Sequence, residues 1–185
     1  MRRREARGKD SRGPAPASLA DREVVESRNI GGISRESLFR RLSDVECFPE
    51  WGYGLRSVRL RPAPLSPSTH SASTVQSGLW PGDQIEFGLR AAGIEHRVTS
   101  LVTRIEPPGL IEWRYLSGAS GYGGWLLEDV PGEAGLTVRM TLSTDYSVEP
   151  PWLDRLAHRP FFRGIISDLM GRSLRRLVEG LEREF

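Results

Sequence analysis

The sequence predicts one α+β domain in which a curved antiparallel sheet wraps around a long C-terminal helix. Between residues 84 and 148, apolar residues recur at every second position, which is typical of strands with one buried face. From Pro160 to Phe185 they recur at steps of three and four, which is typical of a helix with one apolar side. This order, strands first and one long helix last, favours a sheet that packs against that helix.

The segment before these strands contains one strand and two short helices. Alternating apolar and polar residues predict a strand over residues 23–30, which a pair of glycines ends. Ser34 is a predicted N-cap for a helix with apolar residues at helical spacing. Asp44 is a predicted cap for a second short helix, whose length Pro49 limits. Two short helices therefore follow the first strand.

A strand and a long connection come next. The alternation in residues 54–60 places Leu55, Val58 and Leu60 on one surface if the strand contains a bulge. Residues 61–82 are rich in proline and serine and read as a long loop. Two interpretations of this loop stay open, a flap over a cavity mouth and a disordered insertion.

Five further strands follow, joined by short turns. We expect them at residues 84–90, 94–106, 110–116, 120–130 and 135–148. A Pro-Pro-Gly sequence separates the second from the third of these strands. Pro160 suits the first turn of the final helix, which at about 1.5 Å per residue extends over about 35 Å and crosses the whole sheet.

The length of 185 residues suits one domain with a tail. We expect a disordered basic tail over residues 1–20 and the domain over residues 21–185. Residues 1–13 hold six basic and two acidic side chains, although the whole chain has a formal charge of only +2. No aromatic residue stands among these charges, so we do not expect the tail to bind nucleic acid or a membrane. A protein-interaction module that uses the tail is one alternative function.

Several classes of protein are excluded by what the sequence lacks. No apolar run approaches the roughly 20 residues that span a bilayer, and no apolar segment follows the basic start as in a secretory signal. Cys47 is the single cysteine, so no intrachain disulfide forms, and we expect no metal site, no cofactor and a cytoplasmic location. The sequence contains no nucleophile elbow, phosphate loop, dinucleotide fingerprint or HExxH motif. It does not define an oligomeric state.

Three segments and the terminal helix resemble a known family. They are SRESLFRRLSDVECFPEW (34–51), VTRIEPPGLIEWRY (102–115) and GLTVRMTL (135–142). They are similar to the polyketide cyclase/dehydrase and lipid-transport family of the START-like (SRPBCC) superfamily, over residues 23–185, with residues 61–82 least like the family pattern. The resemblance implies a helix-grip fold with a cavity for apolar or amphipathic molecules. It does not imply one reaction, because family members include cyclases, lipid carriers and other binding proteins.

In such a fold the inward side chains of the sheet and the helix line the cavity. The strand residues expected there are Ile85, Phe87, Leu89, Trp113, Tyr115, Trp125, Val138, Met140 and Leu142, and the helix residues are Phe162, Ile166, Leu169 and Met170. The resemblance places Trp51 and Tyr53 near the entrance. The alternative is that all these side chains fill a core, as apolar stripes usually do.

Candidates for catalysis are few. His96 is a general base only if it faces inward, and its polar neighbours Glu95 and Arg97 favour a surface imidazole. Arg90 and Tyr115 are candidates to assist enolisation and aldol closure, but no catalytic motif is matched. Our leading hypothesis is therefore non-covalent binding of a hydrophobic or amphipathic small molecule, lipid-like or polyketide-like. The alternative is a polyketide cyclase or aromatase that acts on a bound poly-ketone.

Overall fold

The structure is a computed structural model, which describes residues 23–64, 78–91, 94–132, 135–148 and 160–184. The predicted basic tail and most of the predicted long loop lie outside these ranges. The flap hypothesis and the protein-interaction hypothesis, which depend on those residues, therefore stay predictions.

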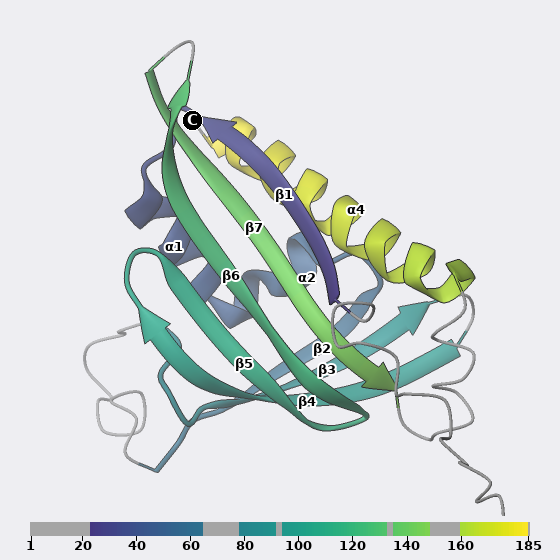
Figure 1. Cartoon of the computed structure of the whole chain (residues 1–185). Coiled ribbons are helices and arrows are strands. Elements are labelled where there is room, and N and C mark those ends of the chain that lie inside the picture. The colour runs from purple at the N-terminus through teal and green to yellow at the C-terminus, as the bar shows by residue number, and fades with distance from the viewer. Residues whose placement is uncertain (1–22, 65–77, 92–93, 133–134, 149–159, 185) are drawn as a thin grey trace, which may run out of the picture.

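Seven antiparallel strands form a single sheet in the order β1-β7-β6-β5-β4-β3-β2 (Figure 1). The strands are β1 (Glu23–Gly31), β2 (Leu55–Arg61), β3 (Gln84–Ala91), β4 (Ile94–Glu106), β5 (Leu110–Ser117), β6 (Ala119–Gly132) and β7 (Gly135–Val148). From β2 to β7 each strand pairs with the next strand in sequence, and only the pairing of β1 with β7 joins distant segments. The five predicted strands from residue 84 onward are all present.

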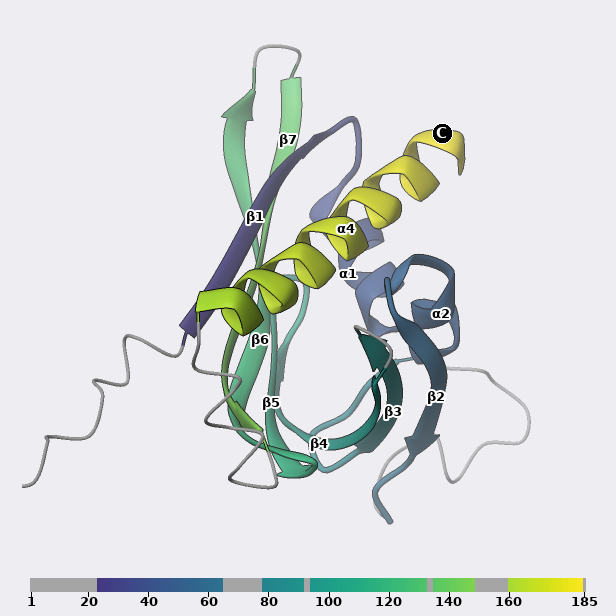
Figure 2. The ribbon, with the colours of Figure 1, turned by 90° about the vertical axis from the view of Figure 1, so that its right-hand side faces the viewer.

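The sheet is strongly curved, and helix α4 (Pro160–Glu184) crosses its concave side (Figure 2). The register between β4 and β5 shifts twice, at Thr99/Ser100 and at Val102/Arg104, and such bulges bend a sheet. A third shift, between Leu55 and Ser57 of β2, is the predicted bulge. The 25 residues of α4 extend over about 38 Å. The predicted α+β helix-grip fold is confirmed. In the described part of the chain, no helix combines the length and apolarity needed to cross a membrane.

Three short helical elements connect β1 to β2. They are α1 (Arg35–Ser43), the 3-10 helix η2 (Val45–Cys47) and α2 (Phe48–Trp51). The Ser37 N–H donates to Ser34 Oγ at 3.2 Å, and the Glu46 N–H donates to Asp44 Oδ1 at 3.2 Å. Both predicted caps are therefore confirmed, and they fix where α1 and η2 begin.

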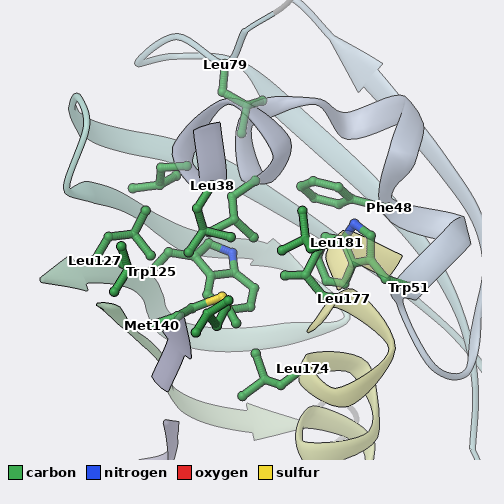
Figure 3. Packing of buried hydrophobic residues seen from close by; sticks show 14 of the residues in the cluster. Leu38, Phe48, Trp51, Leu79, Trp125, Leu127, Met140, Leu174, Leu177 and Leu181 are labelled. Carbon is green, nitrogen blue, oxygen red and sulfur yellow. The ribbon is translucent and has the colours of Figure 1, made fainter. Parts of the chain in front are cut away.

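The hydrophobic core occupies one part of the concave face (Figure 3). Leu38 from α1, Met140 from β7 and Leu174 from α4 are each 0% exposed. Val138 is equally buried beside them. The prediction that Val138 and Met140 line a cavity is therefore wrong, because α1 and the second half of α4 fill the space in front of this part of β7.

Candidate ligand-binding site

A cavity of about 300 Å³ lies between the sheet and the first half of α4. This volume is at the lower end of the range for pockets that hold drug-sized ligands. Twelve of the residues expected to line a cavity or its entrance do so: Trp51, Tyr53, Ile85, Phe87, Leu89, Trp113, Tyr115, Trp125, Leu142, Ile166, Leu169 and Met170. The side chain of Phe162 lies outside the described part of the structure.

Aromatic residues of α2 and β6 border both this cavity and the packed core. Trp51 and Trp125 belong to the core cluster and also line the cavity. Their rings meet edge to face with centroids 6.0 Å apart, an arrangement that aromatic pairs prefer. Phe48 packs against Trp51 with centroids 5.0 Å apart and extends this wall. The concave face thus has a filled part and a hollow part.

His96 lies in the wall of the cavity and not on the surface. It pairs across the sheet with Leu89, and alternation along β4 sends its neighbours Glu95 and Arg97 to the exposed face. The interpretation of His96 as a surface imidazole is therefore wrong. Its Nε2 lies 2.6 Å from the Gly118 carbonyl oxygen, which only accepts, so Nε2 carries a proton. In the neutral ring Nδ1 is then the basic nitrogen.

Tyr115 is the second polar candidate that the structure places in the wall. Its hydroxyl lies 2.7 Å from Thr144 Oγ1, which lies 3.4 Å from the Tyr122 carbonyl oxygen. Because that carbonyl accepts from Thr144, Thr144 in turn accepts from Tyr115. Burial raises the pKa of Tyr115, so the phenol keeps its proton at neutral pH. Its oxygen therefore offers only lone pairs to the cavity.

Arg90 does not reach the cavity. Its side chain is exposed and is not among the residues of the wall, so the structure does not bring it together with His96 and Tyr115. Its main-chain N–H donates to the Gly54 carbonyl at 2.7 Å. Gly54 has φ +81°, and a Cβ there would lie 3.0 Å from the Arg90 carbonyl oxygen. Glycine is therefore required where the chain turns from α2 into β2.

Tyr53 at this turn is held against α4. Its main-chain N–H donates to Ser173 Oγ at 2.8 Å. The guanidinium groups of Arg172 and Arg176 lie 5.0 and 4.9 Å from the centre of its ring, within the range of cation–π contacts. The turn thereby joins α2 to the part of α4 that lines the cavity.

Several further wall residues were not predicted. They are Leu42, Phe48, Gly52, Leu55, Leu79, Val98, Ser100, Val102, Ile111, Ala119, Thr144, Tyr146 and Ser173. Val98, Ser100 and Val102 follow His96 at every second position of β4. Because Val98 and Val102 are apolar, the alternation along β4 predicts that this face points inward and that His96 lies on it.

A smaller hollow of about 190 Å³ also borders Trp51. It is lined by Arg41, Glu50, Trp51, Arg176, Leu177, Gly180 and Arg183. Arg41 and Glu50 form an ion pair there. Within the described ranges, no three histidine, cysteine or acidic side chains gather in a way that could hold a metal ion.

Comparison with known proteins gives both a family and a fold. Residues 21–182 match the family described as polyketide cyclase/dehydrase and lipid transport, whereas no curated protein matches the chain. The Zhui aromatase/cyclase from Streptomyces sp. R1128 is 13% identical with a TM-score of 0.65, over 88% of this chain and 94% of that one. A protein from Thermus thermophilus is 17% identical with a TM-score of 0.64, over 85% and 94%. A START superfamily protein from Mycobacterium smegmatis is 13% identical with a TM-score of 0.57, over 88% and 95%. These likenesses show the fold alone.

Proposed function

Because the chain belongs to the polyketide cyclase/dehydrase and lipid-transport family, we propose that it binds an apolar or amphipathic small molecule between the sheet and α4. The observation that carries this proposal is the cavity wall, which is built almost entirely from aliphatic and aromatic side chains. Water in such a space finds few hydrogen-bond partners, so its displacement by an apolar ligand favours binding. Each Å² of apolar ligand surface buried contributes about 25 cal/mol before the cost of association. The ligand is lipid-like or polyketide-like.

Two groups of side chains make the proposed contacts. The sheet, α2 and the turn after α2 supply mainly aromatic rings, two of which carry a tyrosine hydroxyl. Helix α4 supplies aliphatic contacts from the other side. The contact residues are Trp51, Tyr53, Phe87, Leu89, Trp113, Tyr115, Trp125, Ile166, Leu169 and Met170. Aromatic residues bury a large area with few rotatable bonds, which suits the binding of flat or bent apolar molecules.

Native mass spectrometry of protein purified from its own host, followed by solvent extraction, tests this proposal. We expect a co-purifying small molecule, and we expect saturable binding of the neutral probe N-phenyl-1-naphthylamine to the extracted protein. Leu142→Trp fills the cavity and should abolish probe binding. Leu126→Trp makes the same change at an exposed position of β6 and should leave probe binding intact. The absence of any bound molecule together with the absence of probe binding would refute the proposal.

A second function, polyketide cyclase or aromatase, is favoured by one observation. His96 lines the cavity, and its Nδ1 is left as the basic ring nitrogen because Nε2 is bonded to the Gly118 carbonyl oxygen. In such a reaction His96 takes a proton from a methylene between two carbonyl groups, and the resulting enolate carbon adds to another carbonyl. Incubation with a poly-ketone thioester should then give ring products by mass spectrometry, and His96→Ala should lose them. Products identical to those formed without protein would refute catalysis and leave the binding proposal standing.

A further inference from the structure

One hydroxyl group in the cavity wall, that of Ser100, has no hydrogen-bond partner among the described residues. Ser100 is 1% exposed, and its Oγ finds no donor or acceptor in the part of the chain that the structure describes. Across the sheet it pairs with Ile85 of β3 and Tyr115 of β5. The residues two positions away on the same strand face are Val98 and Val102. The hydroxyl therefore stands among apolar side chains.

Such an arrangement opposes folding. A buried hydroxyl without a partner loses its hydrogen bonds to water and gains none from the protein. A third valine or an alanine would continue the pattern of Val98 and Val102 without this penalty. A polar residue that destabilises the wall of a cavity is a common sign of a residue kept for binding.

Other polar residues of the wall form hydrogen bonds within the protein. His96 bonds to Gly118, Tyr115 bonds to Thr144, and Ser173 accepts from Tyr53 and donates to the Leu169 carbonyl oxygen at 2.8 Å. The indole N–H of Trp51 also lacks a partner among the described residues, but Trp51 borders both the cavity and the smaller hollow. Ser100 borders the larger cavity and not this smaller hollow.

We propose that Ser100 donates a hydrogen bond to an oxygen atom within the ligand. The ligand class is then an apolar molecule that carries a carbonyl, ether or hydroxyl oxygen part way along its body, and not a plain hydrocarbon chain. Ser100 lies four residues along β4 from His96, so the two polar points are about 13 Å apart on one wall. This inference rests on the proposed function, because it concerns the same cavity.

Two probes of nearly equal shape test it. Benzophenone carries a central carbonyl oxygen, and 1,1-diphenylethylene carries a CH₂ group in the same place. We expect the ratio of their affinities, ketone over alkene, to fall about five- to tenfold in Ser100→Ala relative to the unchanged protein. Ser120→Ala, on an exposed part of β6, should leave the ratio unchanged. Ser100→Cys keeps the size of the side chain but donates weakly, and it should behave like the alanine variant.

Thermal unfolding without probe provides a second readout. Because the hydroxyl has no partner among the residues that the structure describes, Ser100→Ala should unfold at the same temperature as the unchanged protein or at a higher one. A lower unfolding temperature would show that the hydroxyl already bonds in the empty protein, and it would overturn the inference. If both probes bind and the affinity ratio is the same in Ser100→Ala as in the unchanged protein, this inference is overturned and the proposed function stands. Failure of both probes to bind the unchanged protein would overturn the proposed function and this inference together.

Discussion

Two leucines of α4, five residues apart, should respond very differently to truncation. Leu174 is 0% exposed and packs in the core with Leu38 and Met140. Leu169 is half-buried and faces the cavity. The substitutions Leu174→Ala and Leu169→Ala change helix propensity equally, so any difference between them reports packing.

The expected magnitudes follow from this difference. Truncating a fully buried leucine leaves a new void and costs about 2 to 5 kcal/mol, so we expect about 3 kcal/mol for Leu174→Ala. Leu169 already borders empty space and loses fewer contacts, so we expect about 1 kcal/mol. For a domain of this size each kcal/mol lowers the midpoint of thermal unfolding by about 2 to 4 °C. The two variants should therefore differ by about 4 to 8 °C.

Urea unfolding followed by tryptophan fluorescence and circular dichroism measures both free energies. Binding of N-phenyl-1-naphthylamine, measured on the same samples, should weaken several-fold in Leu169→Ala and stay unchanged in folded Leu174→Ala. Equal losses of stability in the two variants would refute the reasoning, because they would mean that both halves of α4 pack against a filled core.

Three further predictions concern single residues. Burial and a hydrogen bond to a neighbouring carboxylate raise the pKa of Cys47 to about 11. Iodoacetamide should therefore alkylate Cys47 at pH 7.4 about a hundredfold more slowly in the folded protein than in urea. The alkylation rate of the folded protein should keep rising with pH and show no plateau near pH 9. Asp83 is 0% exposed, and its carboxylate accepts hydrogen bonds from two backbone N–H groups at 2.8 Å. Asp83→Ala should therefore lower the unfolding free energy by about 3 kcal/mol in urea titrations. A loss below about 1 kcal/mol would contradict a stabilising role for these two hydrogen bonds. A Cβ at Gly123 would lie 2.7 Å from the Trp113 ring, so Gly123→Ala should lower the unfolding free energy by about 1 to 3 kcal/mol and change the tryptophan fluorescence. Gly164 lies in open space on α4, so Gly164→Ala should instead stabilise the protein by up to about 1 kcal/mol. Equal effects of the two substitutions would refute the crowding between residue 123 and Trp113.

The strands and the long helix could be predicted because their patterns are local. Alternation along β4 to β7 and the three- and four-residue steps of α4 depend only on which face of each element is buried. The caps at Ser34 and Asp44 are equally local, since each side chain bonds to a backbone group two or three residues away.

The division of the concave face into core and cavity could not be predicted in this way. Met140 and Leu142 are successive inward residues of β7, yet the first is in the core and the second lines the cavity. What separates them is the position of α1 and of the second half of α4, which the pattern within β7 does not contain. That Ser100 lacks a partner among the described residues is likewise visible only once its neighbours on β3 and β5 are in place.

The core and the cavity occupy different stretches of α4. Residues that hold the fold together, such as Leu177 and Leu181, lie in its second half, and residues that would meet a ligand, such as Ile166 and Met170, lie in its first half. Substitutions in the first half can therefore reshape the binding site while the stabilising contacts remain. A protein organised in this way is a good starting point for directed evolution toward new ligands, because substitutions that change its specificity need not lower its free energy of unfolding.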